Sequence, residues 1–150
     1  MSIQVSFLDM VYQYPEDLDK IKAKLEPGLI IGLVGDLGAG KTTFVQLLAK
    51  NLGITEVVNS PTFNLQKLYK MATPLRGIGG LLHVDAYRLN TLLELEDIGF
   101  FELLKKEGTV AVVEWADRLP GLSEYEKYLA IEFFGIDNPD YREIKILEKS

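Results

Sequence analysis

The sequence of 150 residues contains no cysteine and no long apolar run. Without cysteine, disulfide bonds and thiolate zinc sites are excluded, and a reducing compartment fits the composition. A membrane-spanning helix needs about 18 consecutive apolar residues, and no segment approaches that length. The N-terminus carries Asp9, Glu16 and Asp17 in place of a basic start and an apolar core. No signal peptide is therefore expected, and we predict a cytoplasmic protein with no membrane partner.

Basic residues are also scarce. The formal net charge is −6, and there are four arginines, at Arg76, Arg88, Arg118 and Arg142. Proteins that bind nucleic acid by themselves usually carry a basic stripe, because phosphate contacts supply most of their affinity. No such stripe is visible in this sequence. Any role in a nucleic-acid pathway is therefore expected to operate through a protein partner.

The remaining composition is that of a globular protein, with 47% apolar and 25% charged residues. The length predicts one domain over residues 1–150. Strands are expected over 3–7, 29–34, 63–71, 81–84, 109–113, 128–134 and 141–147, and helices over about 41–52, over 92–105 and from Pro15 to Pro27. The stretch Met71–Gly80 is interpreted as an irregular loop. Alternating strands and helices predict a three-layer α/β sandwich, with a mostly parallel central sheet and added antiparallel strands.

One motif restricts the chemistry far more than the rest. Residues 35–42 read Gly-Asp-Leu-Gly-Ala-Gly-Lys-Thr and match the phosphate-binding loop (P-loop) pattern G-x-x-x-x-G-K-[S/T]. An apolar strand pattern at 29–34 precedes the loop, and a helical pattern follows it, which is the strand–loop–helix setting that the motif requires. The loop therefore predicts a site for a nucleoside triphosphate with Mg²⁺.

Each residue type in this loop has a physical role at a phosphate. Glycines let the backbone adopt positive φ angles and approach a ligand closely, so that amide N–H groups converge on phosphate at the start of a helix. Lys41 would span the β- and γ-phosphates, and the Thr42 hydroxyl would bind Mg²⁺. The candidate binding residues are Gly35, Asp36, Leu37, Gly38, Ala39, Gly40, Lys41, Thr42 and Thr43.

Two predicted strands end in a carboxylate, Asp85 after 81–84 and Glu114 after 109–113. In an open parallel sheet, ligands sit at the carboxyl ends of the strands. Both acids are therefore expected to face the ion and the γ-phosphate. One would organise Mg²⁺ directly or through water, and the other would complete its shell or orient the attacking water.

Other polar residues near these strands allow more than one reading. The segment 59–62 is a plain connector or a nucleotide-sensing switch in which Thr62 meets Mg²⁺ or the γ-phosphate. His83, the single histidine, lies inside an apolar strand, which favours a packing role over catalysis. Trp115 is expected to fill the edge of the core in preference to stacking on a base.

Four blocks in order resemble the TsaE family, also called YjeE: the loop with Thr43-Phe44, then Ser60-Pro61-Thr62-Phe63, His83-Val84-Asp85-Ala86-Tyr87-Arg88, and Glu114-Trp115. These are bacterial ATPases of transfer-RNA threonylcarbamoyladenosine synthesis. The resemblance implies a single P-loop domain, ATP and Mg²⁺ as cofactors, and a weak ATPase. It implies TsaD and TsaB as partners, with transfer RNA reached only through that complex.

The resemblance also implies roles by position. Residues 35–43 would hold the phosphates, Thr42 and Glu114 would coordinate Mg²⁺, Asp85 would be the Walker B acid, and Thr62 would lie in the switch. One departure concerns the first helix, which similar proteins begin with an acidic residue and threonine. Here Glu16-Asp17 is followed by Leu18, so the adenine contacts are not assigned.

Two further functions are compatible with a P-loop. A small-molecule kinase shares the loop and Mg²⁺ but usually carries an arginine-rich lid, which four scattered arginines do not build. A nucleotide-gated binding module would bind a partner stoichiometrically with turnover near zero, whereas Asp85 and Glu114 favour hydrolysis. A GTPase is disfavoured, because the sequence has no Asn-Lys-x-Asp segment.

Overall fold

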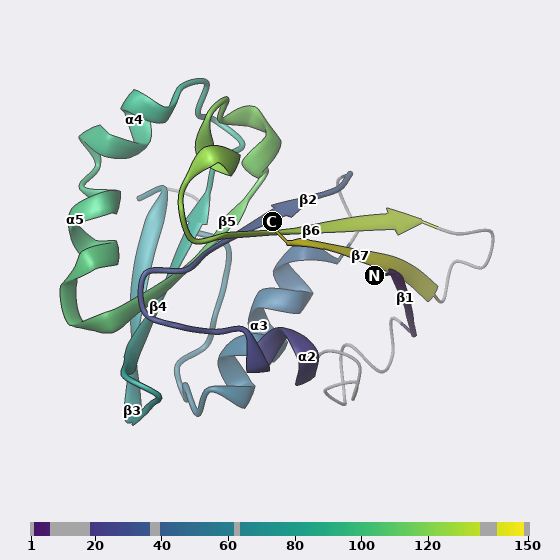
Figure 1. The fold of residues 1–150 in the computed structure, drawn as a ribbon, viewed down its shortest axis with the longest axis horizontal. Helices are drawn as coiled ribbons and strands as arrows, with labels where there is room; N and C mark the ends of the chain where they lie inside the picture. Colours follow the sequence, from purple (N-terminus) through teal and green to yellow (C-terminus); the bar gives the residue numbers. More distant parts are fainter. Residues whose placement is uncertain (1, 7–18, 37–39, 62–63, 136–140, 149–150) are drawn as a thin grey trace.

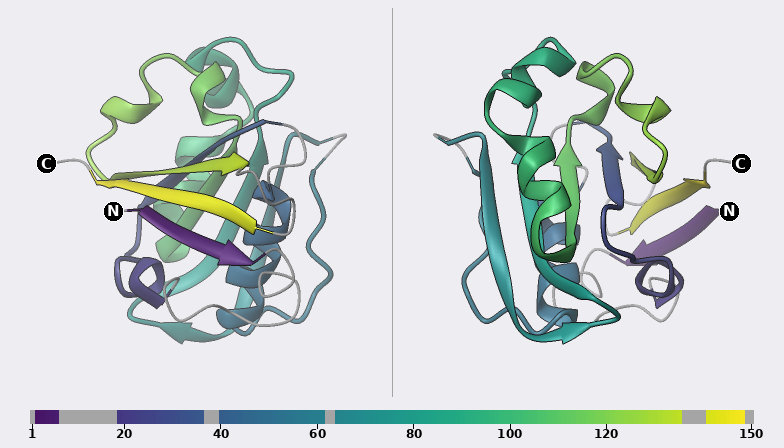
Figure 2. Two further views of the ribbon diagram at one scale, coloured as in Figure 1. Left: turned by 90° about the vertical axis from the view of Figure 1, so that its right-hand side faces the viewer. Right: turned by 60° about the vertical axis from the view of Figure 1, so that its left-hand side comes forward.

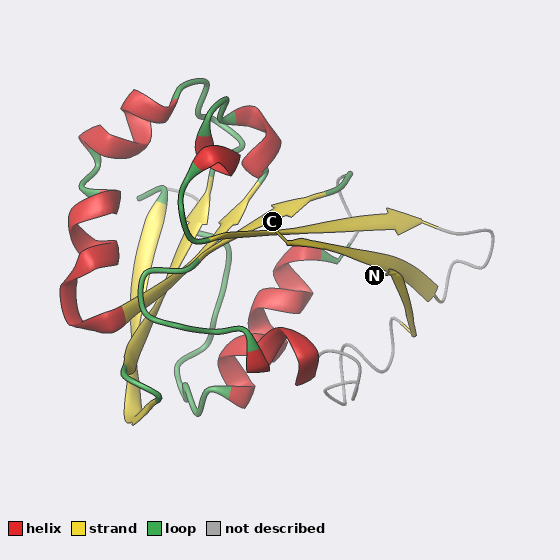
Figure 3. Ribbon diagram, in the orientation of Figure 1, coloured by secondary structure: helices red, strands yellow, loops and turns green. Residues whose placement is uncertain are grey.

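A computed structural model describes residues 2–6, 19–36, 40–61, 64–135 and 141–148. Its centre is a seven-stranded sheet in the order β1-β7-β6-β2-β5-β4-β3 (Figures 1 and 3). The strands are β1 Ser2–Ser6, β2 Ile30–Val34, β3 Gln66–Leu75, β4 Ile78–Asp85, β5 Thr109–Glu114, β6 Tyr128–Gly135 and β7 Tyr141–Glu148.

Four adjacent strands of the sheet, β6, β2, β5 and β4, are parallel. β2 pairs in parallel with β5 on one side and β6 on the other, and β5 pairs in parallel with β4. The edges are antiparallel, where β7 pairs with β6, β1 with β7, and β3 with β4. This arrangement confirms the predicted fold, a mostly parallel central sheet with added antiparallel strands, and the structure shows that both chain ends and a hairpin supply those strands.

Helices cover both faces of the sheet, which gives three layers (Figures 1 and 2). One face packs against α2 and α3, and the other packs against α4 and α5. The α-helices are α2 Asp19–Ala23, α3 Lys41–Asn51, α4 Leu92–Asp97 and α5 Phe100–Lys105, and the 3-10 turns are η2 Lys106–Gly108, η3 Ala116–Arg118 and η4 Leu122–Glu124. Within the described residues, no helix is long and apolar enough to cross a membrane.

The place of β5 inside the sheet explains why the sequence is apolar at each position from Val110 to Val113. Val110 and Val112 belong to the core on the α3 face, whereas Ala111 and Val113 belong to the core on the α5 face. A strand buried on both sides needs apolar residues without alternation. The same two-residue period places Glu114 on the α3 face, together with the helix that follows the glycine loop.

Two predictions about secondary structure were wrong. Met71–Gly80 is not an irregular loop, because β3 and β4 form a hairpin joined by Arg76 and Gly77. Both turn residues have positive φ, 49° and 80°, as a tight two-residue hairpin turn requires. The predicted helix 92–105 is divided at Gly99, whose φ of 80° separates α4 from α5. The predicted start of the first helix at Pro15 lies outside the described residues.

Candidate functional site

The glycine loop connects the central strand β2 to helix α3. Gly40 directly precedes α3 with a φ of 100°, a backbone conformation that favours glycine, and Lys41 and Thr42 are the first helical residues. Gly35 and Asp36 follow the end of β2, and Thr43 is half-buried in the first turn of α3. The predicted loop residues Leu37, Gly38 and Ala39 lie outside the described residues, as does Thr62.

Lys41 is directed back across its own loop. Its side chain is almost completely buried, and its ammonium group donates to the carbonyl oxygen of Gly35 and, at 3.1 Å, to that of Asp36. The ammonium nitrogen also lies 3.7 Å from the centre of the Trp115 ring. Burial lowers the pKa of Lys41 below its ordinary 10.5, and nearby carboxylates, Glu114 first, oppose this shift. The ammonium is thus a desolvated cation, which an anionic ligand would stabilise.

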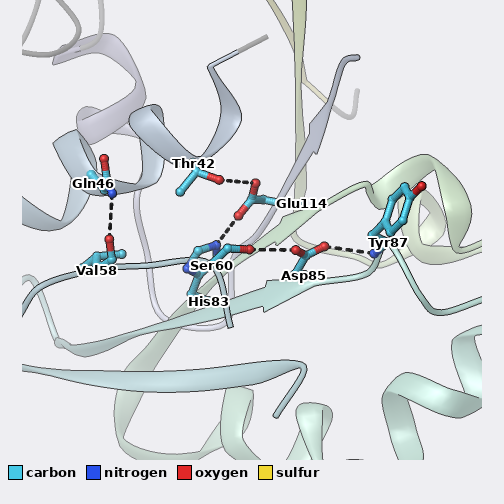
Figure 4. A network of polar contacts seen from close by, with 8 residues as sticks. All are labelled: Thr42, Gln46, Val58, Ser60, His83, Asp85, Tyr87 and Glu114. Carbon is cyan, nitrogen blue, oxygen red and sulfur yellow. Dashed lines mark hydrogen bonds and ion pairs between the residues drawn. The ribbon is translucent and has the colours of Figure 1, made fainter. Parts of the chain in front are cut away.

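Glu114 connects α3 to the sheet at the carboxyl end of β5 (Figure 4). Its side chain is buried, and its Oε1 accepts a hydrogen bond of 2.8 Å from the Thr42 hydroxyl. Its Oε2 lies 2.5 Å from Nε2 of His83 on β4. The contact is possible because β4 and β5 are parallel neighbours, and both side chains point toward the α3 face.

Asp85 holds the segment that follows α3. Its Oδ2 accepts a hydrogen bond of 2.7 Å from the Ser60 hydroxyl, and its Oδ1 accepts one of 3.0 Å from the Tyr87 amide. The same segment is attached to α3 by Gln46, whose side-chain amide donates to the Val58 carbonyl oxygen at 2.8 Å (Figure 4). The connector therefore lies against both the loop helix and the end of β4.

The structure brings Lys41, Thr42, Asp85 and Glu114 to one end of the sheet, as the sequence predicted. Asp85 and Glu114 are register partners on adjacent strands. The contact of His83 with Glu114 was missed, although the predicted burial of His83 is confirmed. Strand periodicity could have predicted this contact. Residues two apart on one strand share a face, so His83 lies on the same face of the sheet as Asp85, whose register partner is Glu114.

Trp115 contacts Lys41 through its ring and has an unusual backbone conformation. Its φ of 60° is unusual for a residue with a large side chain. The ring is half-buried against the core, as expected for a core-edge residue. It also lies 5.1 Å from the Tyr87 ring, and the Arg118 guanidinium carbon lies 5.2 Å from the centre of the Tyr87 ring. A layer of aromatic and cationic groups thus extends from Lys41 to the surface.

The oxygen atoms of Thr42 and Glu114 suit a hard cation that is also bound by water or by a second ligand. The hydroxyl of Thr42 and the carboxylate of Glu114 supply oxygen, which Mg²⁺ prefers, and they lie 2.8 Å apart. Within the described residues, no group of three or more His, Cys, Asp or Glu side chains could hold a metal ion. A magnesium ion at this place would therefore complete its shell with water and with oxygens from a bound ligand.

A sheet with four adjacent parallel strands, a glycine loop between strand β2 and a helix, and acids at the ends of the adjacent strands β4 and β5 define a protein of the P-loop class. A family model described as "Threonylcarbamoyl adenosine biosynthesis protein TsaE" matches residues 13–144. The chain belongs to the TsaE family.

Individual relatives agree with this assignment. The chain is 47% identical over 91 residues to the tRNA threonylcarbamoyladenosine biosynthesis protein TsaE of Bacillus subtilis, over 61% of this chain and 52% of that protein. It thus spans about half the length of that relative. Identity to TsaE of Treponema pallidum is 40% over 123 residues, covering 81% and 84% of the two chains. The crystal structure of Bacillus subtilis YdiB is similar with a TM-score of 0.67 and 31% identity, over 100% of this chain and 86% of that one.

Proposed function

We propose that this chain binds ATP with Mg²⁺, hydrolyses it slowly, and acts in the synthesis of threonylcarbamoyladenosine in transfer RNA. The proposed binding and hydrolysis of ATP rest on one observation: Lys41, Thr42 and Glu114 lie close together beside the glycine loop. Membership of the TsaE family, and the names of its relatives, support the place in transfer-RNA modification.

The start of helix α3 supports binding of an anion. Its N-cap residue Gly40 supplies no side-chain cap, and no acidic residue lies in the first turn. Helix α4 differs, because there the Thr91 hydroxyl accepts a hydrogen bond from the Glu94 amide. The first N–H groups of α3 and the buried Lys41 ammonium would bind the phosphates of ATP.

Glu114 and Asp85 would have different roles, one at Mg²⁺ and the other at the segment that contains Ser60. Thr42 and Glu114 would hold Mg²⁺, which neutralises charge that develops on the transferred phosphoryl group. Asp85 has both carboxylate oxygens engaged, with Ser60 and with the Tyr87 amide. It would therefore act by placing the segment that contains Ser60, whose continuation reaches Thr62, beside the γ-phosphate and the attacking water.

Partner proteins would supply the contact with RNA. The net charge of −6 and the lack of a basic stripe argue against direct binding of transfer RNA. The partners we propose are TsaD and TsaB, and ATP turnover would reset or remodel their complex.

The test measures ATP turnover with and without a TsaD–TsaB pair. We expect the pair to stimulate turnover, and we expect Lys41→Ala and Glu114→Ala each to lower it about a hundredfold, because each removes charge from the phosphate or Mg²⁺ site. Lys127→Ala is the control, since this lysine is an exposed partner of Glu26 near the start of β6, at the opposite end of the parallel strands.

The outcomes separate the possible functions. Equal turnover with and without the pair would refute the dependence on partners. Stoichiometric, nucleotide-dependent binding of the pair with turnover near zero would identify a binding module. Phosphorylation of a metabolite in a broad substrate screen would identify a kinase.

A further inference from the structure

The buried histidine of β4 has one polar contact among the described residues, and that contact is with the site. His83 is fully buried, and its Nε2 lies 2.5 Å from Oε2 of Glu114. Its other ring nitrogen, Nδ1, is buried and has no hydrogen-bond partner in the part of the chain that the structure describes. The neighbouring strand residues Leu82 and Val84 are apolar and equally buried.

The chemistry of the two groups decides where the ring proton lies. A carboxylate oxygen is an acceptor, so Nε2 must carry the hydrogen and donate it to Glu114. In the neutral ring, Nδ1 then carries no hydrogen, and a missing partner costs less there than it would for a buried N–H group. The packing around His83 therefore favours the tautomer that donates to Glu114.

This hydrogen bond to Oε2 also fixes the position of Oε1, the second carboxylate oxygen of Glu114. With Oε2 held by His83, the carboxylate cannot rotate freely, and Oε1 stays 2.8 Å from the Thr42 hydroxyl. Burial of an imidazole beside apolar side chains is unfavourable compared with burial of leucine or methionine. A residue with only a packing role would gain nothing from that cost, whereas one that orients a carboxylate would.

We propose that His83 is a positioning residue, which fixes the Glu114 carboxylate so that Glu114 and Thr42 form a preorganised oxygen site for a divalent cation. This inference rests on the proposed binding of ATP with Mg²⁺. Its consequence is specific, because loss of the Nε2–H group weakens the binding of Mg²⁺ and leaves the binding of nucleotide without metal unchanged.

Two variants of nearly equal size separate positioning from packing. His83→Gln keeps an N–H donor close to the place of Nε2, and His83→Met has the same length without a donor. ATP binding is measured by calorimetry over a series of Mg²⁺ concentrations and again with EDTA. We expect His83→Met to raise the half-saturating Mg²⁺ concentration about tenfold or more, as is typical when an outer-shell partner of a metal ligand is lost. His83→Gln should restore most of this loss, and both variants should match the wild type in EDTA.

An equal Mg²⁺ requirement in the wild type and in His83→Met would overturn the inference, as would an equal loss in both variants. If ATP affinity of the wild type does not respond to Mg²⁺ at all, the proposed function itself fails. The wild-type protein offers a test that needs no variant, because the chain has one histidine. ¹⁵N NMR of that ring should show a protonated Nε2 and an unprotonated Nδ1, and the opposite tautomer would refute the proposal.

Discussion

Gly32, in the middle of the strand that leads to the glycine loop, makes a sharp test of the packing on the α5 face of the sheet. A Cβ atom at this position would lie 1.9 Å from the Tyr128 hydroxyl oxygen and 2.6 Å from Cζ of the same ring. It would also lie 2.9 Å from Cβ of Ala116. The Tyr128 ring, on the neighbouring strand β6, therefore occupies the space that any side chain at Gly32 would need.

The cost of Gly32→Ala follows from this overlap. Contacts below 3.0 Å force a neighbour to move, and here the neighbours are a rigid ring and a residue of the turn η3. Overpacking of a well-filled core costs up to about 3 kcal/mol, and we expect a value near that limit. For a chain of this length, that corresponds to a fall in Tm of roughly 6–12 °C.

The assay is chemical denaturation of four proteins: wild type, Gly32→Ala, Tyr128→Val and the double variant. Removal of the ring should reduce the cost of Gly32→Ala by more than half, which a double-mutant cycle detects. Gly53→Ala is the control, because a Cβ there meets nothing within 4 Å and only the positive φ of 78° is unfavourable, by roughly 1 kcal/mol. A cost of Gly32→Ala that is the same in both backgrounds would refute the steric explanation.

Two further predictions concern single groups. Binding of ATP with Mg²⁺ should change the emission intensity of Trp115, the single tryptophan, because the Lys41 ammonium 3.7 Å from its ring would turn toward phosphate. Lys41→Ala should abolish that change, and constant emission of the wild type at saturating ATP would contradict it. Burial raises the pKa of the Tyr128 hydroxyl to about 12, and the negative charge of Asp117 adds to the shift. The stability that the neutral Tyr128 hydroxyl contributes to the folded state is therefore complete below pH 10 and is lost as the pH rises through 12. From about pH 9 to about pH 11, Tyr128→Phe should therefore lose about 1 kcal/mol less stability than the wild type, and equal losses in a denaturant titration would refute the shift.

Local patterns were sufficient where a residue's own neighbours determine its conformation. The apolar run 109–113 predicted a strand buried on both faces, and β5 is such a strand. The hairpin turn was missed because Arg76, a residue seldom found at positive φ, occupies its first position. The break at Gly99 was missed because the apolar pattern of 92–105 continues across it, although the backbone there turns with a φ of 80°.

The sequence by itself determined the P-loop class of this protein. The spacing of glycines, Lys41 and Thr42 specifies a loop at the start of a helix, since these features depend on residues close together along the chain. The acids at the ends of two strands could be placed at one edge, because parallel strands end there together.

Only the tertiary structure decided which groups contact one another. Strand order and register set the 2.5 Å between His83 and Glu114 and the 2.7 Å between Ser60 and Asp85, across 31 and 25 residues of sequence. The position of the Lys41 ammonium over Trp115 likewise depends on how α3 packs against the sheet beside the end of β5. Periodicity assigns a residue to a face, but distances between faces of different elements arise only when those elements pack together.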